Sequence, residues 1–265
     1  MRELSLDHLS LFDLAPAELV RVAGAAGFQW VGLFLDPLQV EGADAARFDM
    51  SPGSADFRDT QAALAETGIK IAGLDPFLLL PETDAAHLER NLEIGALLGA
   101  RAANIVVLDP DPARREDNLA RLAECAAVHG LRLMIEAYTL SEIRTNRAAL
   151  ALADRVSAAI GLNVDSLHVK RAGDDWDDIA ALPQDRIAYV QMCDGPAAVP
   201  ADLAYEAVFE RGVPGEGELN LAGLMAIIPD GLPVSAEAPS QRLKAQGLSP
   251  VQRAGRLMAG LRTLL

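Results

Sequence analysis

The sequence predicts a single-domain α/β fold in which eight strands and eight helices alternate and close into a (β/α)₈ barrel. Ala- and Leu-rich stretches with helical spacing repeatedly end in a glycine, and an apolar run follows at once. Gly27, Gly68, Gly99 and Gly130 mark four such junctions, and glycine suits the positive φ that follows a helix. The length of 265 residues and the apolar share of 51% fit one barrel. No dinucleotide-binding fingerprint occurs, which favours a closed barrel over an open sheet.

The expected elements follow from these junctions and from the apolar runs between them. Strands are expected near residues 4–10, 28–35, 69–75, 103–108, 131–137, 160–165, 187–192 and 233–237. Helices are expected near residues 16–26, 55–66, 84–98, 114–128, 146–156, 175–181, 220–228 and 249–263. The longest irregular segments, 36–54, 75–83 and 194–219, each follow a strand. In a barrel, such segments lie on the face where active sites are built.

Composition narrows the partners and the compartment. The formal net charge of −15 repels polyanions, so no nucleic acid is expected as a partner. No apolar stretch reaches membrane-spanning length, and no apolar signal segment follows Met1. Cys125 and Cys193 suggest no disulfide framework. We therefore expect a cytoplasmic protein that does not bind membranes.

Four oxygen donors stand at the ends of the last four predicted strands: Glu136, Asp165, Gln191 and Glu237. Side chains at these strand ends converge on the barrel axis. Carboxylates packed together would raise one another's pKa, and a divalent cation removes that repulsion. An oxygen-only set suits Mg²⁺ or Mn²⁺ better than Zn²⁺, with Co²⁺ and Zn²⁺ as alternatives. Four protein ligands leave room for adjacent carbonyl and hydroxyl oxygens of a substrate.

Each of these residues also has an ordinary structural interpretation. A single acid after a strand is often a helix N-cap or a solvated loop residue, and Gln191 could simply be hydrogen-bonded in the core. Four donors in register favour the metal site. His168, three residues after Asp165, could act as acid or base, bind the metal, bind substrate or lie exposed in a loop. Arg211 could reach the barrel mouth to hold substrate or lie on the surface beside a turn.

Other polar residues near strand ends are weaker candidates. His8 could face the pocket near the end of the first strand, or Asp7 could do so instead, because alternation sends only one inward. Tyr138 lies two residues after Glu136 and could touch substrate. Asp75 ends the third predicted strand and could be a polar group of the pocket.

Taken together, these motifs resemble the xylose isomerase-like TIM barrel superfamily. This superfamily includes sugar isomerases and epimerases, inosose dehydratase, one class of 3-dehydroshikimate dehydratase and endonuclease IV. The resemblance spans nearly the whole chain, which we take as one domain over residues 1–265. Its motifs are Glu136 in IEAY, Asp165 and His168 in VDSLH, Gln191 and Asp194 in VQMCDGP, Arg211 before PGEGELN, and Glu237 in SAEAP. The family pattern is usually His-x-x-Asp, and the Gln-x-x-Asp form here is most similar to the bacterial 3-dehydroshikimate dehydratases. The resemblance implies Glu136, Asp165, Gln191 and Glu237 as metal ligands, with His168 and Arg211 facing substrate.

The sequence departs from that branch in ways that bear on the substrate. Leu167 replaces the usual phenylalanine, and Tyr138 stands where relatives carry His or Asn. The dehydratase branch has an arginine soon after its Pro-Phe pair, whereas this chain continues from Phe77 into three leucines at 78–80. Either the substrate is less anionic than dehydroshikimate, or Arg211 and Arg144 supply the positive charge.

Two functions fit these residues. The first is a metal-dependent isomerase or epimerase of a sugar or sugar-like hydroxy-ketone, acting through an enediolate that the cation stabilises. Glu136 and Glu237 would move the α-proton, His168 would hold or protonate an oxygen, and His8, Tyr138 and Arg211 would bind substrate. The alternative is a dehydratase (a lyase) of a cyclic polyol ketone such as 3-dehydroshikimate or an inosose, with His168 as general acid.

Other classes fit less well. Cleavage of DNA at abasic sites would need a basic groove and many histidines, and the chain has four histidines and a charge of −15. A non-catalytic barrel would have lost the ligands, which are present. The expected partner is a small polyhydroxylated molecule, and a homodimer stays open as an assembly.

Overall fold

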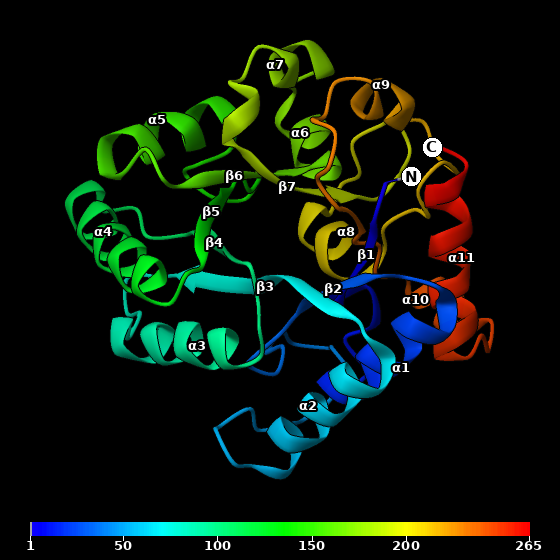
Figure 1. Ribbon diagram of the computed structural model, residues 1–265. Coiled ribbons are helices and arrows are strands. Elements are labelled where there is room, and N and C mark those ends of the chain that lie inside the picture. The colour runs from blue at the N-terminus through cyan, green and yellow to red at the C-terminus, as the bar shows by residue number, and fades with distance from the viewer. Residues whose placement is uncertain (1) are drawn as a thin grey trace.

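The computed structural model describes residues 2–265 and confirms the predicted barrel. Within these residues, eight parallel strands pair in sequence order, and β8 pairs with β1 to close the sheet. The helices surround it (Figure 1). The strands are β1 Leu4–Asp7, β2 Trp30–Leu33, β3 Lys70–Leu79, β4 Ala102–Val107, β5 Arg132–Glu136, β6 Gly161–Asp165, β7 Ile187–Met192 and β8 Val234–Ala236.

The long helices agree with the sequence-based expectation to within about two residues. The helices are η1 His8–Leu11, α1 Pro16–Ala26, α2 Ala55–Thr67, α3 Ala85–Leu97, α4 Pro112–Val128, α5 Asn146–Val156, α6 Ser166–Ala172, α7 Trp176–Ala180, η2 Gln184–Arg186, α8 Leu203–Phe209, α9 Leu221–Met225, α10 Gln241–Ala245 and α11 Pro250–Arg262. The sequence did not predict η1, α6, η2, α8 or α10, which are short. Four of them lie between a strand and the next expected helix, and η2 directly precedes β7.

Local chemistry explains why the boundaries of the long helices were predictable. Gly27, Gly68, Gly99 and Gly130 have φ values of 89°, 70°, 79° and 72°, as the helix–strand junctions require. At the other end, the Ser249 side chain accepts a hydrogen bond from the backbone of Gln252 and caps α11.

Two segments expected to be irregular contain regular structure. β3 continues to Leu79, because after a register shift the segment from Phe77 to Leu79 pairs with Ile105 to Val107 of β4. The segment 194–219 contains α8. His168 lies on α6, which begins directly after β6, so it is not an exposed loop histidine.

The core has two parts, one on each side of the barrel wall. Outside, aliphatic side chains of the strands pack against the helices. Inside, a smaller apolar cluster fills the amino-terminal half of the barrel: Trp30, Ala72, Ala102, Met134 and Tyr189. The Trp30 indole donates a hydrogen bond to Glu3, and the Arg101 guanidinium lies 3.9 Å from its ring centre. Because this apolar cluster fills the amino-terminal end of the barrel, the carboxyl ends of the strands form its open end.

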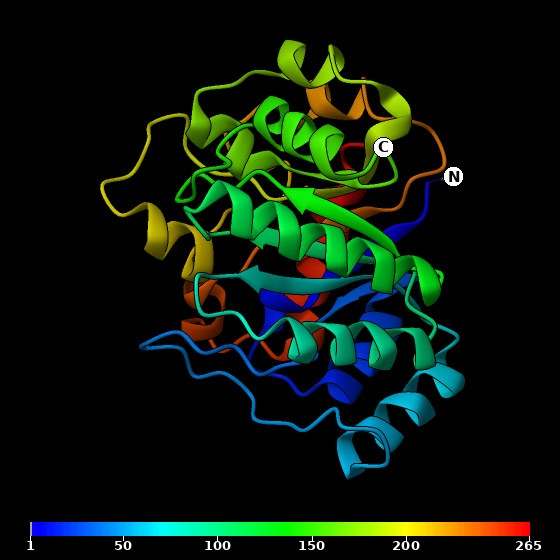
Figure 2. The same cartoon turned by 90° about the vertical axis from the view of Figure 1, so that its left-hand side faces the viewer.

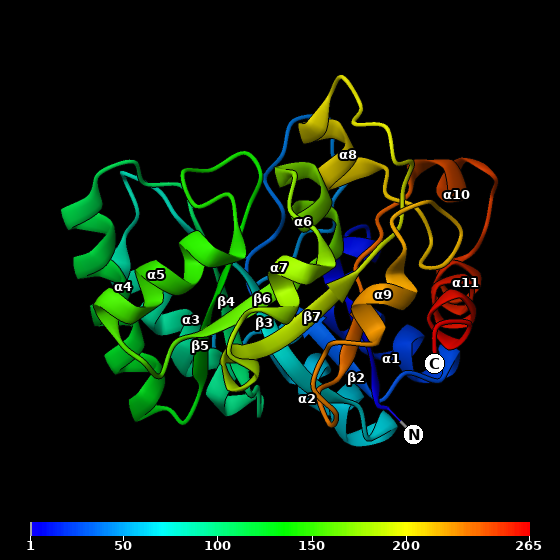
Figure 3. The same ribbon diagram turned by 90° about the horizontal axis from the view of Figure 1, so that it is seen from above.

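The carboxyl ends of the strands point toward one side of the molecule. Figure 2 shows the β3 arrowhead directed toward the side that carries α8 and the loop between β2 and α2. Seen from above, α6 and α8 lie at the same end of the molecule (Figure 3). Of residues 2–265, none belongs to a helix long and apolar enough to cross a membrane.

Candidate active site at the barrel mouth

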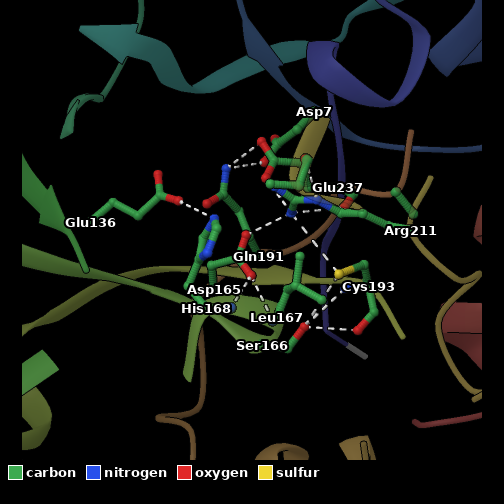
Figure 4. A network of polar contacts seen from close by, with 12 residues as sticks. Asp7, Glu136, Asp165, Ser166, Leu167, His168, Gln191, Cys193, Arg211 and Glu237 are labelled. Atoms are coloured by element: carbon green, nitrogen blue, oxygen red, sulfur yellow. Dashed lines mark hydrogen bonds and ion pairs between the residues drawn. The ribbon is translucent and has the colours of Figure 1, made fainter. Parts of the chain in front are cut away.

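Strand alternation builds the polar layer at the open end of the barrel. Residues two apart on a strand share a face. Four buried polar groups therefore form one layer, each two residues after an inner position of its strand. These groups are Glu136, Asp165, Gln191 and Glu237, which follow Met134, Asn163, Tyr189 and Ser235. Figure 4 shows these four side chains with their polar contacts. The structure thus brings the predicted donors to one end of the barrel.

Asp165 accepts hydrogen bonds through both of its carboxylate oxygens. One carboxylate oxygen, Oδ1, accepts hydrogen bonds from the backbone of Leu167 at 2.7 Å and His168 at 3.2 Å, and so caps α6. The other oxygen, Oδ2, accepts a hydrogen bond from Arg211 at 2.8 Å. The N-cap role considered from the sequence is therefore present, and it leaves Oδ2 directed at the site.

Arg211 lies inside the donor set and not on the surface. Its Nη1 is 2.8 Å from both Asp165 Oδ2 and Glu237 Oε2, and its Nε donates to the carbonyl of Ala207 at 2.8 Å. The residue is buried, with 3% of its area exposed. The guanidinium therefore bridges two of the predicted metal ligands.

Asp194 fixes the loop that follows Arg211. Its carboxylate accepts hydrogen bonds from the backbone of Gly195 at 2.9 Å, Gly215 at 3.1 Å and Leu219 at 3.0 Å. A Cβ atom at Gly217 would lie 2.4 Å from Asp194 Oδ1, so this position admits only glycine without movement. The glycines of the PGEGE segment thus allow a close backbone approach to Asp194 and hold the loop beside the site.

A second acidic group surrounds the Gln191 amide. The Gln191 Nε2 lies 2.9 Å from Asp7, 2.7 Å from Asp75 and 2.8 Å from Glu237. Its Oε1 accepts a hydrogen bond from Asn163 at 2.5 Å. Of the alternatives at the end of β1, Asp7 is the side chain that enters the polar layer.

Two asparagines that sequence reasoning missed support the donors from within the strands. Asn104 on β4 donates to Asp75 at 2.9 Å and to Glu136 at 2.5 Å, and Asn163 lies 3.4 Å from Glu136. Both amides are fully buried. Their signal in the sequence was a lone amide inside an apolar strand, and Asn163 also shares the face of Asp165 by spacing.

The crowding of these carboxyl groups raises most of their pKa values. Burial raises the pKa of Asp7 to about 6, and burial together with the charge of Asp7 raises the pKa of Asp75 to about 7. Burial and neighbouring acids also raise the pKa of Glu136 and of Glu237 well above the ordinary value. Bound protons or a cation are therefore needed to offset the repulsion among these four carboxyl groups.

Asp165 is the exception, although it shares Arg211 with Glu237. Burial alone would raise its pKa, but Arg211, His168 and the backbone hydrogen bonds of α6 hold the pKa below the ordinary value. Glu237 lacks such backbone donors and faces Asp75 and Asp7 as well as Arg211. We therefore assign the charged carboxylate of the Arg211 pair to Asp165.

His168 presents one ring nitrogen to the site. Its Nδ1 is 3.0 Å from the Thr139 hydroxyl, whereas its Nε2 is buried, has no hydrogen-bond partner among the described residues, and lies 3.6 Å from Glu136 Oε1. Burial lowers the pKa of His168 to about 4, so the ring is neutral near pH 7. The Tyr138 ring meets it edge-on, with centroids 4.6 Å apart.

His8 is held by backbone contacts outside the donor set. Its Nε2 is hydrogen-bonded to the carbonyl of Leu14 at 2.9 Å, and its Nδ1 accepts a hydrogen bond from the backbone of Phe34 at 3.1 Å. The ring stacks on Phe34 with centroids 4.7 Å apart, and Phe48 lies beyond. These contacts occupy both nitrogens, so the structure does not bring His8 to the donor set, and its role in substrate binding stays a prediction.

A cavity of about 170 Å³ opens above the donors. Its polar lining consists of Asp75, Glu136, Tyr138, His168, Arg211 and Glu237. The remaining lining is apolar and comes mainly from the loop after β2, from the carboxyl-terminal parts of β3 and β4, and from α8. The cavity admits a small molecule whose reacting end meets carboxylates and a neutral imidazole.

The donor chemistry fits a divalent cation. Two buried groups have ligand atoms within 4.8 Å of one another, namely Glu136 with Asp165 and His168, and Asp7 with Asp75 and Glu237. Three of the four predicted ligands are therefore divided between two neighbouring groups, with Arg211 between Asp165 and Glu237. Gln191 belongs to neither group, and its amide nitrogen faces Glu237. The raised pKa of Glu136 and of Glu237 indicates a missing positive partner. His168 Nε2 is a buried polar atom without a hydrogen-bond partner among the described residues.

An eight-stranded parallel barrel with these acidic groups at its carboxyl end is a (β/α)₈ barrel with a candidate divalent-metal site. The sequence profile of the xylose isomerase-like TIM barrel family matches residues 20–264, so the chain belongs to that family. A curated relative from Pseudomonas aeruginosa, a 3-dehydroshikimate dehydratase, is 32% identical over 98% of this chain and 41% of its own length. The chain thus spans about two fifths of that relative.

Solved structures agree on the fold. A xylose isomerase-like TIM barrel/4-hydroxyphenylpyruvate dioxygenase fusion protein matches with a TM-score of 0.77 and 26% identity, over 99% of this chain and 42% of its own. The IOLI protein, solved with a zinc atom, matches with a TM-score of 0.80 and 15% identity, over 100% of this chain and 98% of its own. The predicted resemblance to the family, and to its dehydratase branch, is confirmed.

Proposed function

We propose that this chain is a divalent-metal-dependent lyase that removes water from a cyclic hydroxy-ketone of the 3-dehydroshikimate type through an enolate. The observation that carries the proposal is the buried oxygen-donor set at the carboxyl ends of β5 to β8, beside the unpartnered nitrogen of His168. Enolate chemistry needs a positive charge at the ketone oxygen and a base at the α-carbon. The relative from P. aeruginosa supports dehydration as the outcome.

We propose Glu136, Asp165, Gln191 and Glu237 as the residues that would hold the cation. Mg²⁺ and Mn²⁺ fit a set made of oxygen donors, and the zinc atom in the IOLI protein keeps Zn²⁺ among the ions to be tested. A bound cation would polarise the ketone and stabilise the negative charge that develops on its oxygen. Asn163 supports the set by donating to the Gln191 oxygen.

His168 is the proposed proton carrier. Its neutral ring would take the proton from the α-carbon at Nε2, leaving the electron pair in the enolate. The imidazolium so formed would give that proton to the β-hydroxyl as the carbon–oxygen bond breaks, so water leaves and the ring returns to its neutral form. The low pKa of the ring, which burial causes, keeps it in the basic form at pH 7. Thr139, bonded to Nδ1, would hold the ring in place.

The test is turnover of 3-dehydroshikimate by the Mn²⁺-supplemented protein, followed as the rise in ultraviolet absorbance of 3,4-dihydroxybenzoate. His168→Gln keeps a polar side chain but cannot carry a proton, so we expect kcat to fall by about 10² to 10⁴. His87→Gln is the matched control, because His87 lies on α3 and pairs with Asp36 outside the cavity. A rate in His168→Gln equal to that of the control would exclude the assignment.

Isomerisation or epimerisation is the second candidate. Glu136 on β5 and Glu237 on β8 both line the cavity, so a proton taken on one side of a substrate could return on the other. Incubation with ketoses in D₂O distinguishes the two reactions. Exchange of the α-proton without loss of water would favour an isomerase or epimerase, and formation of the catechol would favour the lyase.

A further inference from the structure

The cavity has two unlike halves. Its floor carries the carboxylates, His168 and Arg211, whereas its outer part is apolar. Six apolar side chains that reach the cavity are only partly buried or exposed: Leu9, Leu38, Val40, Leu78, Leu108 and Val208. Leu78 is 40% exposed and Val40 is 36% exposed. We call these six residues the apolar rim.

Positive charge is scarce around this rim. Among residues 2–265, Arg211 is the one Lys or Arg side chain that lines the cavity. Its Nη1 already contacts two carboxylates, at 2.8 Å each. Arg144, the other cation considered from the sequence, is exposed and does not line the cavity. Arg171, a buried residue of α6, forms an ion pair with Glu206 at 2.7 Å.

The positive groups of the floor already face the protein's own acids. Asp75, Glu136, Asp165 and Glu237 are four acids at or beside the cavity. Arg211 contacts two of them, and a divalent cation held by this set would lie among the same carboxyl groups. Neither positive group therefore lies at the apolar rim.

A substrate carboxylate placed against the apolar rim would lose its water without gaining a partner, which is costly. An uncharged apolar substituent would instead gain from burial against the six aliphatic side chains. The proposed reaction does not need the carboxylate, because the proton, the ketone and the leaving hydroxyl all lie at the other end of the substrate.

We infer that the substrate presents an uncharged, apolar substituent to the apolar rim, in the place where 3-dehydroshikimate carries its carboxylate. This inference rests on the proposed function and narrows its substrate class to hydroxy-ketones with a neutral, apolar end. Leu78, at the exposed end of β3, is then a residue that determines specificity.

The first experiment compares 3-dehydroshikimate with its methyl ester, in which the group facing the rim has lost its charge and gained one methyl group. The Mn²⁺-supplemented protein is assayed for formation of the corresponding catechol. We expect kcat/KM to favour the ester by roughly tenfold or more, the ratio that one unfavourable charge contact gives. Equal values, or a preference for the acid, would overturn the inference while leaving the lyase proposal in place.

The second experiment adds a cation to the rim. Leu78→Arg should shift the acid-to-ester ratio of kcat/KM toward the acid by about tenfold, relative to the matched neutral variant Leu78→Gln. The position is exposed, so both variants are expected to fold. An unchanged ratio would show that the rim does not contact this substituent, which contradicts the inference.

A binding measurement separates the inference from the proposed function. If neither acid nor ester reacts, the lyase proposal fails, and calorimetry with the Mn²⁺-loaded protein decides the remaining question. The ligands are 3,4-dihydroxybenzoate and 4-methylcatechol, which share the chelating diol and differ in the charge of the substituent. Tighter binding of 4-methylcatechol supports the apolar rim as a recognition surface, and equal or tighter binding of the benzoate overturns it.

Discussion

Replacing Arg211 by methionine tests whether a positive charge between Asp165 and Glu237 stabilises the barrel mouth. The substitution keeps an apolar stem but removes the Nη1 that lies 2.8 Å from each carboxylate. Removing one partner of a buried ion pair costs about 3–5 kcal/mol. We expect a value near the lower limit, about 3 kcal/mol, because the raised pKa of Glu237 allows that group to become neutral. For a chain of this size, the melting temperature should fall by about 6–12 °C.

The proposed metal site adds a second expectation for this variant. A divalent cation held by Asp165 and Glu237 would replace the missing charge, so saturating Mn²⁺ should restore most of the lost melting temperature. Arg211 would also no longer compete for these two carboxylates. The increase in melting temperature on adding Mn²⁺ should therefore be larger in Arg211→Met than in the unsubstituted protein.

The assay is thermal unfolding of the chelator-treated protein, with and without Mn²⁺. Arg171→Met is the matched control, because it removes an equally buried guanidinium from an ion pair with Glu206, outside the donor set. The control should lose a similar melting temperature and gain no additional rescue from Mn²⁺. Equal rescue of both variants, or of neither, would refute the reasoning.

Three further expectations concern the supports of the site. Asn163→Ala removes the hydrogen-bond donor to Gln191. It should destabilise the protein by about 1–3 kcal/mol in urea unfolding and weaken Mn²⁺ binding in calorimetry. An unchanged affinity for Mn²⁺ would argue against this support. Gly217→Ala should lower the free energy of unfolding by about 1–3 kcal/mol through its clash with Asp194, whereas Gly255→Ala, whose added Cβ meets nothing within 4 Å, should not destabilise. Between pH 6.5 and 8, the free energy of unfolding of the metal-free protein should fall as the pH rises. The raised pKa values of Asp75, about 7, and of Glu136 and Glu237 mean that the folded state binds more protons than the unfolded state. A flat profile in urea unfolding would contradict the charge assignment.

The buried histidines oppose the effect of the acids in the lower part of this pH window. Burial lowers the pKa of His8 and of His168 to about 4 from the ordinary value of 6.5. Their contribution to stability is lost as the pH falls toward and below 6.5, which opposes the effect of the acids in that range. Above about pH 7.5 both histidines are almost entirely neutral in the unfolded state as well, so the acids dominate the slope in the upper part of the window.

The barrel could be predicted from sequence because its signals are local. The glycine junctions require only the backbone conformation of one residue, and strand alternation places Glu136 and Asp165 on the inner face whatever the loops do. The short helix α6 was missed because its start coincides with the end of β6, where Asp165 is both strand end and cap.

The contacts between distant segments could not be predicted in the same way. Arg211 lies 46 positions from Asp165 and reaches it only because α8 and the loop held by Asp194 return the chain to the mouth. The alternation rule left His8 and Asp7 undecided, and the stacking of His8 on Phe34 settles which of the two lies in the polar layer. Such choices depend on packing between segments, which no local pattern records.

The central claim is that the donors at the ends of β5 to β8 hold a divalent cation, and metal content tests it most directly. The purified protein and its variants Asp165→Asn and Glu237→Gln, each dialysed against Mn²⁺ and then metal-free buffer, are compared by elemental analysis. Asparagine retains the cap of α6, so loss of metal cannot be attributed to the helix. We predict about one equivalent of metal in the unsubstituted protein, the number that one octahedral site holds, and little in either variant. Equal metal content in all three proteins would contradict the site.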